Sequence, residues 1–186
     1  MLSNQPTTFR RRKKVHIDST VANASQLLAA VLKGLWRQEG IPSQFVCIGT
    51  DRSTGDALGP LVGSAITGKV PSSIRVYGTL ESPVHGANLQ GYLSQSGSPR
   101  ERTMAIDASL GKVDDIGMVW VGIGPLQPGA GLQKQLPSVG HYHLVGTVNA
   151  GGFMDYFVLQ NTRLSVVMTM ASVIAEAIVL SLKNDS

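Results

Sequence analysis

The stretch from Phe45 to Pro60 constrains the fold of this chain more than any other. It begins as a short apolar run of β-forming residues, breaks at Gly49, and resumes at Asp56 with a helical pattern. A strand, a polar loop and a helix in this order open an α/β unit. Ligands in open α/β sheets gather at the carboxyl ends of strands, so we expect the functional site at this loop.

A purely structural interpretation of the same residues stays open. Asp56 could be an ordinary helix N-cap, and Gly49 and Gly55 could simply supply turn conformations. A nucleotide site is not indicated, because the glycines at 49, 55 and 59 do not fit G-x-G-x-x-G and no Gly-Lys-Ser/Thr follows them.

The positive charge of the chain is concentrated near its N-terminus. Five of the 16 basic residues form the run Arg10–Lys14, and residues 19–186 carry 11 basic and 11 acidic side chains. We predict a basic flexible tail over residues 1–18 and a single domain over residues 19–186, a length that suits one core. The tail could contact nucleic acid, but such runs are usually solvated.

The single cysteine, Cys47, lies inside the first predicted strand, so the chain has no disulfide framework. A small buried apolar role is expected for it. A reducing compartment is the simpler assumption, and no apolar stretch after the basic run resembles a signal peptide. We therefore expect a cytoplasmic protein.

Strands and helices alternate along the rest of the chain. This pattern predicts an α/β fold, a three-layer α/β/α sandwich around a mostly parallel five-stranded sheet with one antiparallel strand. The link at Asp114-Asp115 is too short for a crossover helix, so the third and fourth strands are expected to form the antiparallel pair. The predicted strands are 45–48, 74–80, 103–108, 116–123 and 144–148, and the predicted helices are 21–36, 56–68, 87–93 and 164–182.

The last predicted helix, residues 164–182, is apolar enough to raise the question of a membrane span. Four polar residues recur along one side of it at helical spacing: Ser165, Thr169, Ser172 and Glu176. A polar stripe with a glutamate in the middle favours a buried helix of a soluble domain over a membrane span. The remaining apolar surface could cover the sheet and also support a homo-oligomer.

Two carboxylates follow two separate predicted strands. Asp56 follows the first strand and Asp107 stands at the end of the strand over 103–108. Adjacent parallel strands would bring them together, and two close carboxylates can share one proton and divide acid and base roles. A structural role for Asp107, as an acid capping a turn, stays open.

The two acid motifs carry a family resemblance. Gly55–Pro60 and Ile106–Leu110 resemble the paired motifs of the germination protease of bacterial spores, an atypical aspartic peptidase. The chain from Phe45 to Leu182 is similar to the YyaC-type family of proposed spore proteases, most clearly over Asn149–Leu164. Both groups are similar to hydrogenase maturation endopeptidases, which implies an α/β/α sandwich with one antiparallel strand.

The resemblance implies a sporulation-associated peptidase whose catalytic pair is Asp56 and Asp107. In the hydrogenase maturation enzymes these two positions bind metal together with a histidine after the fifth strand, where this chain has Asn149. His141 and His143 lie before the core of that strand and are expected to be surface or structural residues. We therefore expect neither a metal nor another cofactor.

The resemblance also implies a protein or peptide substrate, with a location in the cytoplasm, including the forespore or spore interior. We expect four residues to bind that substrate: Asp51, Arg52, Ser53 and Asn149. No membrane partner is expected. Two rival functions stay open, a non-catalytic binding protein on the same fold and a metal-dependent maturation protease.

Overall fold

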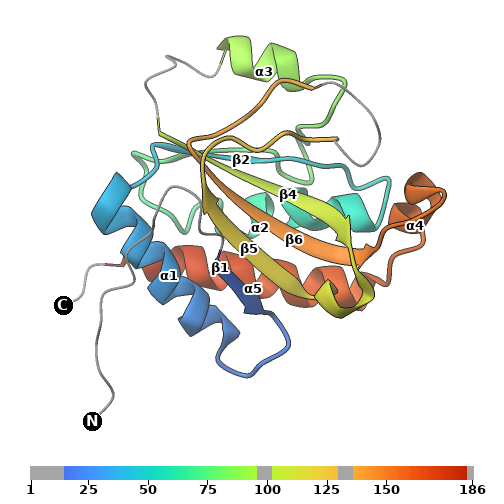
Figure 1. Cartoon of the computed structure of the whole chain (residues 1–186). Coiled ribbons are helices and arrows are strands. Elements are labelled where there is room, and N and C mark those ends of the chain that lie inside the picture. The colour runs from blue at the N-terminus through green and yellow to red at the C-terminus, as the bar shows by residue number, and fades with distance from the viewer. Residues whose placement is uncertain (1–14, 96–101, 130–135, 184–186) are drawn as a thin grey trace.

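The computed structural model describes residues 15–95, 102–129 and 136–183. These residues form a six-stranded sheet in the order β1-β5-β6-β4-β2-β3 (Figure 1). The strands are β1 Val15–Asp18, β2 Gln44–Cys47, β3 Arg75–Tyr77, β4 Thr103–Gly111, β5 Met118–Ile123 and β6 Tyr142–Ala150. The helices are α1 Ala24–Glu39, α2 Leu58–Ile66, α3 Leu89–Gln95, α4 Asp155–Gln160 and α5 Leu164–Leu182, with 3-10 turns η1 Gly55–Ala57 and η2 Val113–Asp115.

The sheet confirms the predicted α/β class with a single reversed strand. β5 pairs antiparallel with both β1 and β6, whereas β2 pairs in parallel with β3 and β4, and β4 in parallel with β6. The sheet has six strands and not the predicted five, because residues 15–18 form β1. β1 therefore lies within residues 1–18, the range predicted to be a flexible tail. The basic run Arg10–Lys14 lies outside the described residues.

The predicted pairing of the third and fourth strands is wrong in one respect. β4 and β5 do run in opposite directions, but β6 lies between them. The link from Lys112 to Gly117 has six residues, and an extended chain advances about 3.3 Å per residue, so it can span two strand spacings of about 4.8 Å. A short link therefore requires reversal of direction but not direct pairing.

The two faces of the sheet are covered unequally. α1, α2 and α5 cover one face, where their side chains form the larger core with the apolar residues of the strands. α3 and nearby loops cover part of the other face around Val46 and Ala105 (Figure 1). Burying a leucine contributes about 1.5–3 kcal/mol, so Leu28, Leu32 and Leu35 of α1, all fully buried, anchor that helix.

The bounds of α5 are those predicted from its periodicity. Ser165, Thr169, Ser172 and Glu176 are exposed, and Ser25 of α1 donates a hydrogen bond to Glu176 at 2.7 Å. By length and composition α5 is also the one helix in the described part of the chain that could cross a membrane. In the structure it packs beside α1 and α2, with eight buried residues on its inner side.

Candidate functional site

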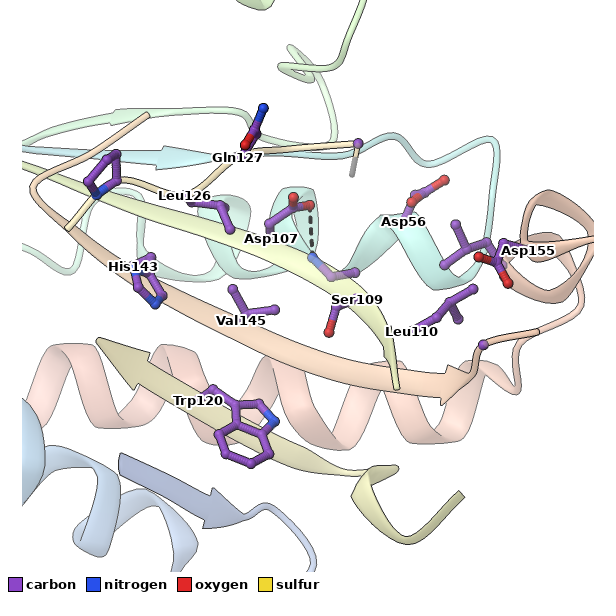
Figure 2. Close-up of a pocket in the computed structure, with 15 residues that line it drawn as sticks. Asp56, Asp107, Ser109, Leu110, Trp120, Leu126, Gln127, His143, Val145 and Asp155 are labelled. Carbon is purple, nitrogen blue, oxygen red and sulfur yellow. Dashed lines mark hydrogen bonds between the residues drawn. The ribbon is translucent and has the colours of Figure 1, made fainter. Parts of the chain in front are cut away.

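A pocket of about 680 Å³ opens on the sparsely covered face of the sheet (Figure 2). Three neighbouring strands form its floor, and the lining part of β4 runs without a break from Asp107 to Leu110. β4 contributes Asp107 and Ser109, β6 contributes His143 and Val145, and β5 contributes Trp120. The remaining walls come from Asp56, Asp155 and Leu159 and from the loop after β5 at Pro125, Leu126, Gln127 and Gly129.

The loop between β2 and α2 delivers Asp56 to this pocket. Gly59 allows it, because a Cβ there would lie 2.1 Å from the carbonyl oxygen of Ile48. The start of α2 therefore touches the backbone at the end of β2. Asp56 lies inside η1, and the N-cap residues of η1 and α2 are Thr54 and Ala57, so the N-cap interpretation of Asp56 is wrong.

Asp107 lies within β4 and not at its end. The strand continues to Gly111, and Asp107 pairs in register with Val145 of β6. The interpretation of Asp107 as an acid capping a turn is therefore wrong. Its Oδ1 accepts a hydrogen bond from the backbone N–H of Ala108 at 2.9 Å.

The pKa of Asp107 is raised from 3.8 to about 8. Burial is the main cause, since a low-dielectric surrounding disfavours the charged carboxylate. The hydrogen bond from Ala108 opposes this shift, and the negative charge of Asp56 adds to it. The two predicted catalytic acids therefore interact electrostatically, and Asp107 carries its proton at neutral pH.

Hydroxyl and indole groups fix the floor beside the acids. The indole Nε1 of Trp120 donates a hydrogen bond to Oγ1 of Thr147 at 3.2 Å, and the hydroxyls of Ser109 and Thr147 lie 3.5 Å apart. On β1, the ring of His16 contacts Trp120 in a tilted arrangement, with ring centroids 4.8 Å apart. This arrangement holds a large apolar surface at the floor of the pocket.

The two histidines near β6 have different positions. His143 lines the pocket, and its Nδ1 donates to the carbonyl oxygen of Gly124 at 3.0 Å. Its Nε2 lies over Gly122, where a Cβ would come within 2.5 Å. His141 is exposed, and its Nδ1 accepts the backbone N–H of Thr103 at 3.2 Å. Each ring thus has one nitrogen in contact with a backbone group, and His143 also borders the pocket.

The four residues predicted to bind substrate do not line the pocket. Asp51 and Arg52 are exposed in the loop before η1, while Ser53 is buried and its Oγ has no hydrogen-bond partner among the described residues. The amide of Asn149 donates to Thr162 at 3.2 Å and accepts the N–H of Ala150 at 2.8 Å. None of the four is among the described residues that line the pocket.

Several pocket residues were not predicted from the sequence. Trp120, His143 and Asp155 line the pocket, the last from the start of α4. The signal for the strand residues was the alternation in β4 and β6, which puts Asp107 with Ser109 and His143 with Val145 on one face. Asp155 had no such signal, because α4 was not predicted.

Metal-binding potential is low in the described part of the chain. It contains no group of three or more His, Cys, Asp and Glu side chains that could hold a metal ion. Cys47 is buried in the larger core, where burial raises the pKa of its thiol and keeps it protonated. The absence of metal and of other cofactors stays a prediction.

The fold and the site define an α/β protein with an acidic pocket on the open face of a mixed sheet. The chain belongs to the family described as "Protein of unknown function (DUF1256)", whose model matches residues 15–177. It is 46% identical over 175 residues to the protein of Bacillus subtilis (strain 168) described as "Uncharacterized protein YyaC". The match covers 92% of this chain and 85% of that protein. The predicted relationship to YyaC is thus confirmed, and neither description states an activity.

Proposed function

We propose that the protein is a peptidase of the atypical aspartic type that hydrolyses peptide bonds with a water activated between Asp56 and Asp107. The observation that carries this proposal is the raised pKa of Asp107, about 8, beside a second carboxylate on the wall of one pocket. Two acids in unequal environments can take opposite roles at one pH. Burial keeps the proton on Asp107 near neutral pH, and the charge of Asp56 adds to the shift in its pKa.

The proposed reaction begins with the carboxylate of Asp56 acting as general base. Asp56 accepts a proton from the water, whose oxygen bonds to the scissile carbonyl carbon, while Asp107 donates its proton to the carbonyl oxygen. A neutral tetrahedral diol results. The proton on Asp56 then moves to the leaving nitrogen, the C–N bond breaks, and Asp107 recovers its proton from the diol. Both acids return to their starting states, and no oxidant or cofactor is consumed.

The walls of the pocket suit an uncharged or cationic stretch of peptide. Trp120, Leu126 and Val145 offer apolar contacts, and Gln127 offers an amide. Three aspartates and no lysine or arginine are among the described lining residues, so an acidic segment is disfavoured. An association with sporulation and a cytoplasmic location, spore interior included, rest on the family resemblance and belong to this proposal.

The test is the cleavage of a fluorogenic peptide library by the full chain and by three variants. Asp56→Asn and Asp107→Asn should each reduce kcat by at least about a hundredfold, the contribution of a general acid or base. Asp114→Asn is the matched control, because Asp114 is exposed on η2 outside the pocket. Full activity in either pocket variant would exclude the acid pair. Binding of peptides without cleavage by the unmodified chain would favour the non-catalytic binding protein.

A further inference from the structure

An exposed group of apolar side chains surrounds the start of α4. Phe153 is 96% exposed, and Met154, Tyr156 and Phe157 are each more than half exposed. We call these four residues the α4 aromatic patch. Single exposed apolar residues are normal on protein surfaces, but four within five consecutive residues form a concentrated apolar surface. The rings of Tyr156 and Phe157 contact each other edge to face, with centroids 5.9 Å apart.

The patch is held in position by contacts on the inner side of α4. Leu159 is buried against Gly55 of η1, where a Cβ would lie 2.8 Å from its Cδ2 and 3.0 Å from its carbonyl oxygen. α4 thus rests directly on the 3-10 turn that carries Asp56. Asp155 accepts the backbone N–H of Gly152 at 2.7 Å, which fixes the loop before the helix.

Met154 adopts a backbone conformation that costs free energy. Its φ is +73° and its ψ is +45°, the left-handed region, and it is the one non-glycine residue with positive φ in the described ranges. Strained backbone of this kind persists where surrounding contacts enforce it and is frequent at ligand-binding sites. Here the left-handed residue lies between the exposed Phe153 and the start of α4.

The patch and the pocket share α4 as a common wall. Asp155 and Leu159 face the pocket, and α4 projects beyond the ends of β4 and β6 (Figure 1). Asp155 stands at the same end of the pocket as Asp56, remote from His143 (Figure 2). A cavity of about 680 Å³ is of the size that holds a drug-sized ligand. A polypeptide bound there must therefore continue over the rim.

We propose that the α4 aromatic patch binds an apolar segment of a polypeptide whose neighbouring residues occupy the pocket. This inference rests on the proposed function and names its substrate class: an extended or unfolded polypeptide with an exposed apolar segment, not a short polar peptide. The continuity of patch and pocket through α4 favours this occupant over a second copy of the chain or a lipid surface. The aspartates of the pocket disfavour an acidic segment as its neighbour.

The binding test uses the full chain carrying Asp107→Asn, so that no probe is cleaved. The probe is a fluorescein-labelled 20-residue peptide with a central Leu/Phe-rich segment and Ser, Gly and Lys flanks. The control peptide replaces each Leu and Phe by Ser or Gln. Fluorescence anisotropy should show at least tenfold tighter binding of the apolar peptide. The double variant, Phe153→Ser with Phe157→Ser, should weaken that binding at least tenfold when it is added to this chain.

The matched control is Ile41→Ser, because Ile41 is 53% exposed, like Phe157, and lies just before β2 at the opposite end of the sheet. It should change the affinity less than twofold. Equal binding of the two peptides, or equal binding by the double variant, would overturn the proposal. Two other results would overturn it if the peptide does not bind. One is a dimer in sedimentation that the double variant abolishes, and the other is binding to phosphatidylglycerol vesicles that the double variant abolishes.

A cleavage assay with unmodified Asp107 separates the two proposals. The double variant should raise KM for the apolar peptide and leave kcat within twofold. Patch-dependent binding without cleavage by the parent chain would retain the docking surface and reject the peptidase. Cleavage with the same kcat/KM in the double variant would retain the peptidase and reject the docking surface.

Discussion

Asp56 and Asp107 reach one pocket from two separate strand units, and the charge of Asp56 adds to the burial that raises the pKa of Asp107. The first acid comes from the turn after β2 and the second from within β4, two strands that pair in parallel. This pairing explains how residues 51 positions apart come to line one pocket. It also links the chemistry of the site to the stability of the fold.

Asp107→Asn should stabilise the protein, and increasingly so as the pH rises. The unfolded chain loses the Asp107 proton near its ordinary pKa of 3.8, whereas the folded chain keeps it up to about 8. The folded state therefore binds more protons between these values, and its stability falls as the pH rises through them. Asparagine does not ionise, so the variant does not lose stability in this way as the pH rises.

Urea unfolding measures this effect. The free-energy difference between Asp107→Asn and the parent should be smallest near pH 4 and reach at least about 1 kcal/mol at pH 8, since one pKa unit corresponds to about 1.4 kcal/mol. Above pH 8 it should level off. Asp114→Asn serves as the control and should show no such trend. A difference that stays constant from pH 4 to pH 8 would mean that Asp107 titrates normally.

The sequence predicted the parts of the fold that have strong local patterns. The 19 residues of α5 carry enough apolar periodicity to define both ends of the helix. β1 was missed because Val15–Asp18 is only four residues long and follows a basic run. Its place at the sheet edge depends on antiparallel pairing with β5, a tertiary contact that local sequence does not encode.

The candidate site was predicted less completely than the fold. The acid pair could be proposed because both residues follow strong strand signals. Trp120 reaches the pocket through the crossing from β4 to β5, and Asp155 reaches it through α4. No local pattern indicated either of these features. The loop at Asp51 was predicted to line the site, but the close contact of Gly59 with Ile48 brings Asp56 inward and leaves Asp51 exposed.

Removing β1 should destabilise the domain, whereas removing the residues before it should not. Val15 and Ile17 pack against the larger core, and the ring of His16 contacts that of Trp120. Deleting residues 1–18 should therefore cost about 1–3 kcal/mol, from cross-strand pairs of about 0.2–1 kcal/mol each and lost burial. Deleting residues 1–14, a polar and basic segment, should change the free energy of unfolding by less than about 0.5 kcal/mol. Equal losses in the two deletions would show that the earlier residues also stabilise the fold.

Two glycine-to-alanine variants should have opposite effects on stability. At Gly59 an added Cβ would lie 2.1 Å from the Ile48 carbonyl oxygen, so α2 must move away from β2, at a cost of about 2 kcal/mol or more. At Gly34, in the interior of α1, nothing lies within 4 Å of the added Cβ. Gly34→Ala should stabilise by about 0.5–1 kcal/mol through helix propensity. Thermal unfolding of both variants tests this, and tolerance of Gly59→Ala would contradict the close contact that positions Asp56.

Chelators should leave any peptidase activity intact. Nickel and zinc sites favour imidazole or thiolate ligands, and the described pocket residues offer three aspartates and His143, whose two ring nitrogens face Gly124 and Gly122. Cys47 is buried in the larger core and is not a pocket residue. Elemental analysis of the isolated full chain should therefore find no stoichiometric nickel or zinc, and EDTA should not change kcat.

About one such ion per chain, lost in both Asp56→Asn and Asp107→Asn, would establish the metal-dependent protease instead. His143→Ala would then test that histidine as the third ligand. The variant should lose the ion if His143 is a ligand and retain it if His143 only lines the pocket.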